Sequence, residues 1–460
     1  MNARAQRVVF FVSLVLLLGG CGVYVPQTVS LWADVHPQGW VVFTGSRAPF
    51  PPPPPQKPID LANKILLFHP ALGVTLTTVE EPSVELSWPR FGPNDALYFI
   101  GNSQKIYKLS ISFDDMERSI YDPQLLLQAK PRSLQEAQLL WTDEGGISAL
   151  ALSPDGRYIA FLRESESYSN KQFAVVIVDM AQDPPKEVAA LSTVYLTRVI
   201  WTADSKAVLL AHQEPERSVK IGDQEFSLGM ITRYEIDTAK ETVLARGVLF
   251  STGPQDQDGS SYPESVYGPG PLALSPDGQT LYYTDLVTLS PRTAQDMRLG
   301  LYSVELASGA RQLLFELPQE EIGHELAVSP SGRRLAFTAV SYRVGMGGFA
   351  LHSALYLADG DHVRQLAQQT NGWLFPLWLD DVQLAYVQFR IEITEGEQPA
   401  LPAGVQPALW VHNVATGERS NHLPALTTQI QIDALRQRIR QLEERVQNLE
   451  KALHELQNKK

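Results

Sequence analysis

Three stretches of alternating apolar and polar residues recur along the chain, each interrupted by a Ser-Pro-Asp-Gly or Ser-Pro-Ser-Gly turn. They occupy residues 151–161, 273–283 and 327–337. Apolar residues at every second position predict strands, and proline followed by glycine predicts a tight turn between them. Each stretch is therefore predicted to form a β-hairpin. A single hairpin cannot bury its own apolar face, so recurring hairpins predict an architecture of stacked repeats.

Weaker copies of the same pattern lie between these three. The predicted turn residues are Gln38, Asn94, Asp155, Asp204, Asp277, Ser331 and Asp380. A second alternating stretch follows each copy, starting near Ile65, Ile106, Val175, Ile231, Leu301, Leu355 and Leu409. Seven pairs of hairpins predict an all-β propeller of seven four-stranded blades over residues 28–424. The first copy is the loosest, so a six-bladed ring in which residues 28–46 are only a tether stays open.

The Ser-Pro-Asp-Gly phrases at 153–156 and 275–278, with the strands that follow them, resemble the TolB-type (WD40-like) β-propeller repeats of bacterial envelope proteins. The resemblance covers most of residues 60–424 and implies the propeller fold. It implies little about function. TolB itself pairs a six-bladed propeller with an N-terminal α/β domain, and this chain has no room for that domain.

The N-terminus has the pattern of a secretion signal. Arg4 and Arg7 precede an apolar run over residues 8–18 that is short for a membrane span. The run ends in Leu-Gly-Gly-Cys21, which resembles the bacterial lipobox. Residues 1–20 are therefore predicted to be a lipoprotein signal peptide, Cys21 the lipidation site and residues 21–27 a lipidated tether. The alternative is an ordinary cleaved signal with an incidental cysteine. The predicted location is extracytoplasmic, anchored by lipid to a bacterial membrane, and the choice between inner and outer membrane stays open.

The charge balance limits the classes of partner. The chain has 51 acidic and 38 basic residues, a formal net charge of −13, and Cys21 is its only cysteine. An acidic surface argues against nucleic acid as a partner and against electrostatic docking on anionic lipid. Membrane attachment is therefore expected through the lipid anchor only. The proline-rich residues 49–58 predict a stiff polyproline segment. In a seven-bladed ring this segment is an insertion within the first blade, and in a six-bladed ring it is a spacer that holds the propeller off the membrane.

The pattern changes its period from two to three and a half over residues 428–460, which predicts a coiled coil. Its predicted core positions are Ile432, Leu435, Ile439, Leu442, Val446, Leu449, Leu453 and Leu456. Arg438 with Glu443, and Arg445 with Glu450, are spaced to form ion pairs between parallel helices. Residues 438–443 and 445–450 also resemble the Arg-apolar-x-x-apolar-Glu trimerisation motif. A parallel trimer is favoured; a dimer, a helix folded back on the propeller and pairing with another protein stay open.

No catalytic motif is recognisable in the sequence. It contains no Gly-x-Ser-x-Gly elbow, phosphate-binding loop or His-Glu-x-x-His, and its nine histidines lack metal-ligand spacing. The chain is therefore predicted to be non-catalytic, without a metal or cofactor. Residues 256–264 are interpreted as a solvated loop, with calcium binding as the minor alternative. Five tryptophans are expected to pack between blades, with ligand stacking as the alternative: Trp88, Trp141, Trp201, Trp373 and Trp378.

Long connections are predicted to gather on one face of the ring. They comprise the second-to-third strand connections at 211–229, 284–298, 339–353 and 388–408, and the blade-to-blade links at 121–140 and 247–269. Loops of this kind usually form the binding face of a repeat protein. Tyr168, Arg217, Tyr342 and Arg343 are candidate contacts for an unknown envelope protein or polymer. The sequence thus favours a membrane-anchored binding scaffold. A lyase or glycan-processing propeller enzyme with a site in the central funnel, or a purely structural envelope component, are the alternatives.

Overall fold

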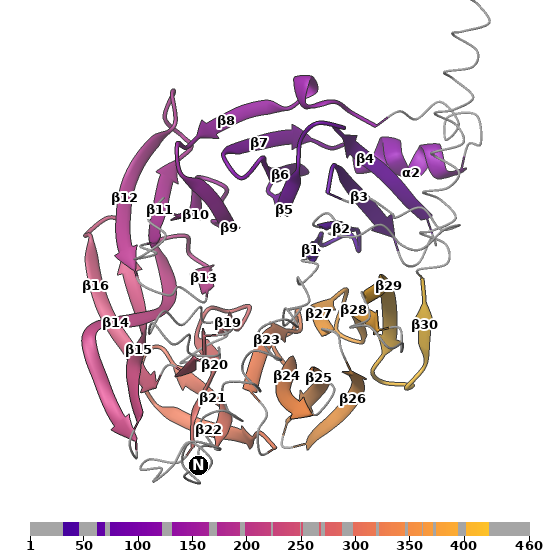
Figure 1. The fold of residues 1–460 in the computed structure, drawn as a ribbon. Coiled ribbons are helices and arrows are strands. Elements are labelled where there is room, and N and C mark those ends of the chain that lie inside the picture. The colour runs from indigo at the N-terminus through magenta and orange to yellow at the C-terminus, as the bar shows by residue number, and fades with distance from the viewer. Residues whose placement is uncertain are drawn as a thin grey trace, which may run out of the picture.

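The computed structural model forms seven antiparallel four-stranded sheets around a central axis (Figure 1), which confirms the seven-bladed propeller. The structure describes residues 31–45, 62–69, 74–121, 131–164, 173–193, 198–221, 224–248, 250–251, 266–267, 272–287, 298–318, 322–345, 348–360, 362–370, 374–393 and 402–422. Each sheet is built from four consecutive strands, so every blade is one continuous piece of chain.

The first strand of each blade is innermost and the fourth is outermost (Figure 1). Blades 1 and 2 contain β1 (Leu31–Val35), β2 (Val41–Gly45), β3 (Lys64–His69), β4 (Val74–Glu80), β5 (Leu86–Gly92), β6 (Ala96–Gly101), β7 (Lys105–Ser110) and β8 (Gln138–Thr142). Blades 3 and 4 contain β9 (Gly146–Leu152), β10 (Tyr158–Glu164), β11 (Phe173–Asp179), β12 (Lys186–Thr193), β13 (Arg198–Trp201), β14 (Ala207–Ile221), β15 (Gln224–Glu235) and β16 (Lys240–Val248).

Blades 5, 6 and 7 complete the ring. They contain β19 (Leu272–Leu274), β20 (Thr280–Leu286), β21 (Leu299–Glu305), β22 (Arg311–Glu316), β23 (Ile322–Val328), β24 (Arg334–Gly345), β25 (Gly348–Asp359), β26 (His362–Thr370), β27 (Leu374–Trp378), β28 (Gln383–Ile393), β29 (Pro402–Asn413) and β30 (Arg419–Asn421). A small ribbon of β17 (Phe250–Ser251) and β18 (Val266–Tyr267) lies in the link between blades 4 and 5.

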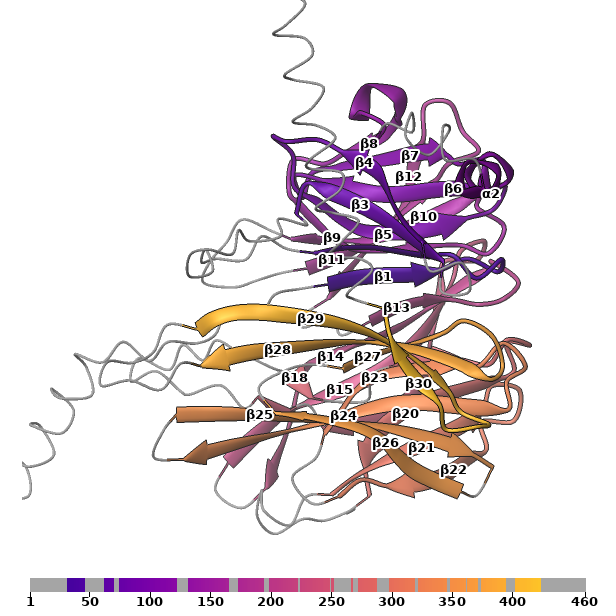
Figure 2. The same cartoon turned by 90° about the vertical axis from the view of Figure 1, so that its right-hand side faces the viewer.

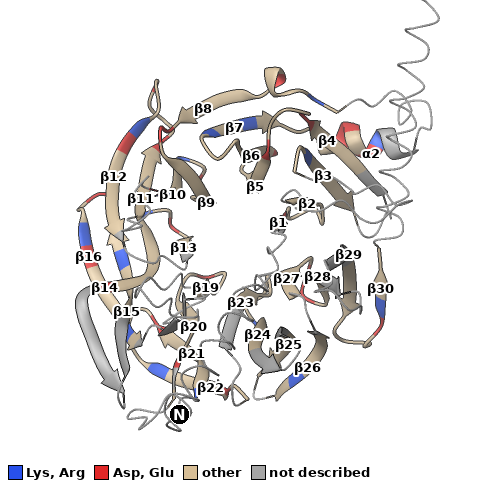
Figure 3. Cartoon of the chain, in the orientation of Figure 1, with Lys and Arg blue, Asp and Glu red and all other residues tan. Residues whose placement is uncertain are grey.

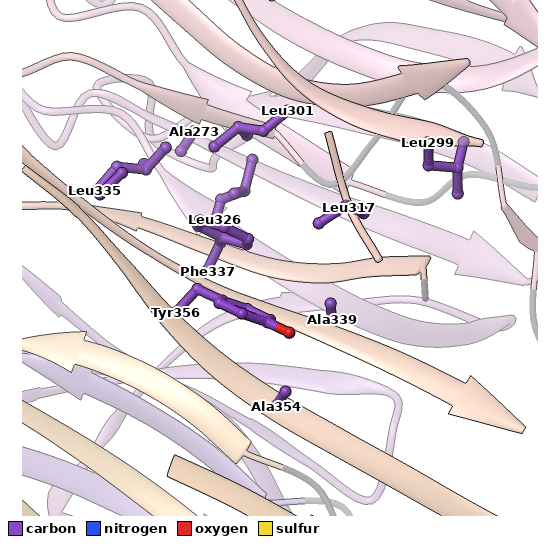
Figure 4. Close-up of a cluster of buried hydrophobic side chains, with 11 residues drawn as sticks. Ala273, Leu299, Leu301, Leu317, Leu326, Leu335, Phe337, Ala339, Ala354 and Tyr356 are labelled. Atoms are coloured by element: carbon purple, nitrogen blue, oxygen red, sulfur yellow. The ribbon is translucent and has the colours of Figure 1, made fainter. Parts of the chain in front are cut away.

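The hydrophobic core is divided among the spaces between blades. Seven clusters of buried side chains are present, and each joins two neighbouring blades. In β10, Ile159 and Phe161 pack toward blade 2, while Tyr158, Ala160 and Leu162 pack toward blade 4. Figure 4 shows the cluster between blades 5 and 6. Successive side chains of a strand lie on opposite faces, so both faces of the middle strands are buried and their sequences are continuously apolar.

The ring closes by packing between blades 1 and 7. Val41, Phe43 and Phe68 of blade 1 lie in one cluster with Ala385 and Leu409 of blade 7. This interface therefore depends on buried apolar area, like the other six.

The tight turns between first and second strands also join neighbouring blades. Asp155 accepts hydrogen bonds from the Ser153 hydroxyl at 2.6 Å and the Arg157 backbone N–H at 3.0 Å, which closes the turn of blade 3. Asp277 in blade 5 is bound in the same way. The Asp155 backbone N–H in turn donates to the Ser205 hydroxyl of blade 4 at 3.0 Å. The repeated turn residues thus stabilise both their own hairpin and the contact with the next blade.

One predicted connection is wrong. Residues 121–140 were expected to link two blades, but 138–142 form β8, which pairs with β7 inside blade 2. The segment before β8 contains α2 (Phe113–Tyr121) and η1 (Leu134–Glu136). Arg132 there exchanges backbone hydrogen bonds with Thr78 and Glu80 of β4, at 2.9 and 3.2 Å. The insertion therefore covers the outer edge of blade 1, which explains why blade 2 departs from the repeat length.

The two terminal predictions lie outside the described residues. These are the signal peptide with Cys21, and the coiled coil over 428–460 with its core positions and ion pairs. Among the described helices, none is long and apolar enough to cross a membrane.

Candidate functional site

Three blades extend their middle strands beyond the ring as two-stranded arms. The arms are β14–β15 in blade 4, β24–β25 in blade 6 and β28–β29 in blade 7. Their ladders continue outward to the pairs Ile221 with Gln224, Gly345 with Gly348, and Ile393 with Pro402. The sequence predicted long loops at 211–229, 339–353 and 388–408, whereas most of these residues are paired strand. Arg217, Tyr342 and Arg343 accordingly lie on arm strands, and Tyr168 lies outside the described residues.

The arms share one face of the ring, here called the arm face. In a four-stranded antiparallel blade, the connection from second to third strand and the link to the next blade leave at the same end. Figure 2 shows β24–β25 and β28–β29 running out of the ring on the same side. The prediction that 211–229, 339–353 and 388–408 extend from one common face is therefore confirmed.

Both ends of the ring also lie on the arm face. The first strand β1 runs from the arm face toward its tight turn, and the last strand β30 runs back toward the arm face. The segments that lead to Cys21 and to residues 428–460 therefore attach at this face. The proline-rich residues 49–58 are outside the described part of the chain, in the connection between β2 and β3.

The ladder register gives two arms alternating apolar and polar pairs. In β24–β25, Tyr342 is opposite Leu351 and Val344 is opposite Phe349, with Arg343 opposite Ala350 between them. In β28–β29 the apolar pairs are Phe389 with Pro407 and Ile391 with Val405, separated by Arg390 with Gln406. The ladder register of both arms therefore alternates between apolar and polar pairs.

An ion cluster around the buried Asp143 carboxylate supports the arm face between blades 2 and 3. Arg163 of β10 lies 2.7 Å from the Asp143 carboxylate and 2.9 Å from Glu187. The Asp143 side chain is only 5% exposed and also accepts hydrogen bonds from Trp141 Nε1 and the Gly145 backbone. Burial by itself raises the pKa of Asp143, but the hydrogen bonds from Arg163, Trp141 and Gly145 outweigh it and hold the pKa below its ordinary value. Asp143 is therefore a charged structural anchor.

Trp88, Trp141, Trp201 and Trp378 pack against clusters between neighbouring blades, as predicted. Trp201 Nε1 donates to the Ala151 carbonyl of blade 3 at 3.3 Å, and Trp378 Nε1 donates to Ala327 of blade 6 at 2.9 Å. Trp141 binds Asp143, and Trp373 lies outside the described residues. Trp88 also lies on β5, the innermost strand of blade 2.

Four residues on the innermost strands of blades 1 and 2 form an axial cluster: Trp32 and Asp34 of β1, and Trp88 and Arg90 of β5. The Trp32 and Trp88 rings are 5.8 Å apart, and the Arg90 guanidinium lies 5.5 Å from the centre of the Trp88 ring. Arg90 donates to the carbonyl of Ala33 in blade 1 at 2.9 Å and to that of Leu150 in blade 3 at 3.2 Å. Figure 3 shows the innermost strands as mostly uncharged.

The Asp34 carboxylate is held in place by backbone and charge. It accepts a hydrogen bond from the Phe91 backbone N–H at 2.8 Å. Burial raises the pKa of Asp34 above its ordinary value, and the nearby Arg90 charge opposes this only in part. The sequence pattern predicted a role for Trp88 but not for Asp34 and Arg90. Alignment of the seven repeats on their turns would have revealed them.

The other predicted site residues have structural positions. Asn94, Asp155, Asp204, Asp277, Ser331 and Asp380 lie in the turns between first and second strands, on the face opposite the arms. Within the described ranges, no group of three or more His, Cys, Asp or Glu side chains could hold a metal ion. The candidate calcium loop at 256–264 lies outside these ranges.

Comparison with known proteins identifies the fold alone. No protein-family model and no curated protein matches the sequence. A puromycin-hydrolyzing peptidase from Mycobacterium tuberculosis is 11% identical with a TM-score of 0.50, over 86% of this chain and 53% of that chain. A putative TolB from Agrobacterium tumefaciens is 16% identical with a TM-score of 0.39, over 66% and 88%. An oligogalacturonate lyase in complex with manganese is 14% identical with a TM-score of 0.44, over 75% and 80%. The structural neighbours thus include enzymes and a TolB-like protein, and this chain spans about half the length of the peptidase.

Proposed function

We propose that this chain is a non-catalytic, lipid-anchored binding scaffold that recognises an envelope protein or polymer through its arm face. The observation that carries the proposal is the projection of three two-stranded arms from one face of a rigid ring. Paired strands would present their backbone to a partner at a lower ordering cost than a loop. The alternating apolar pairs of β24–β25 and β28–β29 supply contact area for a protein partner.

The proposed anchor would bring this face close to the membrane. Cys21 lies ten residues before Leu31, where β1 starts at the arm face. Ten residues span at most about 35 Å when fully extended. A partner bound by the arms would then lie between the ring and the membrane, which favours a partner that is itself attached to the envelope.

The anchor is tested by replacing its cysteine. The full chain expressed in a bacterium should incorporate radiolabelled palmitate and sediment with membranes, because an acylated cysteine contributes about 0.8 kcal/mol per buried methylene. Cys21→Ser should abolish both the label and the membrane attachment. Attachment that survives in Cys21→Ser without label would show that lipid at this position is not the anchor.

The proposed coiled coil is tested by mass in solution. The Cys21→Ser protein lacking residues 1–20 should have the mass of a trimer by light scattering, because its heptads match a parallel three-stranded seam. Removing residues 428–460 should reduce the mass to one third. A twofold change would indicate a dimer, and an unchanged mass would contradict self-association through this segment.

The second candidate is a propeller enzyme with its site at the axis. The observation that favours it is the axial cluster, where the pKa of Asp34 is raised by burial beside Arg90. Shifted carboxylates of this kind are common in catalytic sites. An enzyme of the lyase or glycan-processing type should lose turnover of its polysaccharide in Asp34→Asn while still binding it.

A further inference from the structure

The other five blades show which residue types the repeat accepts at the positions of Asp34 and Arg90. The blades can be aligned on the residue that closes each first hairpin: His36, Gly92, Ser153, Thr202, Ser275, Ser329 and Leu379. Two residues before it, blades 3 to 7 carry Ala151, Ile200, Ala273, Ala327 and Leu377, while blades 1 and 2 carry Asp34 and Arg90. Five of seven blades therefore fold with an apolar residue at this position, and the charged pair is not required by the repeat.

The two indoles are a second departure from the repeat, although blade 7 has another aromatic residue, Phe375, at the same position. Trp32 and Trp88 lie two residues before Asp34 and Arg90, where blade 3 carries Ala149. Trp88 has a backbone φ of 51°, a left-handed conformation that is unfavourable for a bulky side chain. Ala149 of blade 3 adopts the same conformation, with φ 54°. Blades 2 and 3 therefore share this irregular backbone, whereas only blade 2 has a large aromatic ring on it. A bulky residue at a strained position is more often retained for function than for stability.

The Trp32 indole lies outside the hydrophobic core clusters of the described residues. Both Trp32 and Trp88 are half-buried, and their rings are tilted by 40° to each other. Trp88 packs against the cluster between blades 2 and 3. The Trp32 ring packs against Trp88, and its half-exposed remainder is the surface that a ligand at the axis would meet.

We propose that the axial cluster binds a neutral oligosaccharide. The C–H face of a pyranose ring stacks on the electron-rich face of an indole, while its hydroxyl groups need both an acceptor and a donor. Asp34 supplies an anionic acceptor and Arg90 a cationic donor group beside the two indoles. The opposite charges offset each other, so a neutral sugar is preferred to an acidic one, which would meet the Asp34 carboxylate. This site goes beyond the proposed scaffold function, because it depends on neither the arms nor the anchor.

Titration of the detergent-solubilised full chain with cellotetraose, chitotetraose and maltotetraose tests the proposal. At least one should bind with a dissociation constant of about 1 mM or lower, by calorimetry and by a change in tryptophan fluorescence. Trp32→Ala should weaken binding about tenfold or more, since it removes the stacking surface without opening a core cluster. Asp34→Asn, which keeps the shape but not the charge, should weaken it by a smaller factor.

The matched control is Trp410→Ala. Trp410 also has an arginine over its ring, with the Arg419 guanidinium 4.9 Å from the ring centre, but it lies on β29, away from the axis. Trp410→Ala should bind as wild type does. The proposal is overturned if none of the three sugars binds at about 10 mM, or if Trp32→Ala binds them normally. Binding of only a proline-rich peptide at this site would also overturn it.

Discussion

Replacing Arg163 by methionine should lower the free energy of unfolding by about 3–5 kcal/mol at neutral pH. The change removes the cation that neutralises Asp143, whose side chain is 5% exposed, and leaves a buried charge without its ion-pair partner. Methionine keeps most of the aliphatic volume, so the loss would report the charge and not a cavity. Urea denaturation followed by circular dichroism measures it.

The pH dependence distinguishes this effect from simple loss of packing. The pKa of Asp143 in the folded protein lies below its ordinary value. The stabilisation from Arg163 is therefore present above about pH 4 and is lost as the pH falls through the folded-state value. Wild type and Arg163→Met should thus converge in stability as the pH falls below the ordinary range of a carboxylate and through the lowered folded-state pKa of Asp143.

Arg298→Met is the matched control for the ion pair. Arg298 lies 3.3 Å from Glu316, but the two side chains are 50% and 45% exposed. Water screens this pair, so its loss should cost about 0.5 kcal/mol or less. Equal losses in Arg163→Met and Arg298→Met would contradict the role assigned to the buried cluster.

Replacing Gly156 by alanine should destabilise the ring by about 3 kcal/mol, through backbone strain and a clash between blades. Gly156 has φ +70°, a conformation that L-residues rarely adopt. A methyl group here would also lie 2.8 Å from Pro93 Cδ in the turn of blade 2, and closer still to Pro93 Cγ. The rigid proline ring cannot move aside without shifting its own turn.

Gly309→Ala separates the two contributions. Gly309 has φ +71°, nearly the same as Gly156, but an added methyl group would meet nothing within 4 Å. Its substitution should cost only the backbone strain, about 1–2 kcal/mol. The difference between the two variants in thermal or urea unfolding measures the contact between adjacent turns. Equal effects would mean that the turns of blades 2 and 3 do not press on each other.

The repeat phrase made the fold predictable, because it marks both where each blade starts and where its first hairpin turns. Even the loosest copy, around Gln38, turned out to be a complete blade whose second hairpin starts near Ile65. The α2 insertion was missed because a short helix interrupts one repeat without changing its strands. Phe113 at its start packs on His36 of blade 1 with ring centres 4.3 Å apart, a contact between distant segments that no local pattern reveals.

The functional surfaces were predictable only in outline. The sequence located the extended connections but described them as loops, since charged residues such as Glu216 and Arg217 obscure the alternation in β14. The hydrogen bond from Asp155 to Ser205 joins two repeats and is invisible within either one. Asp34 and Arg90 were detectable in principle, as exceptions to a position that is apolar in five blades, but their proximity required the closed ring.

The central claim, that the arm face is the binding surface, is tested most directly by site-specific photo-crosslinking in native membranes. A photoreactive amino acid would replace Arg343 on β24 or Arg390 on β28, and, as controls on the opposite face, Asp277 or Val382. The two arm positions should form an adduct with the same envelope component, and the two turn positions should form none. Adducts from the turn positions alone would place the binding surface on the other face and contradict this claim.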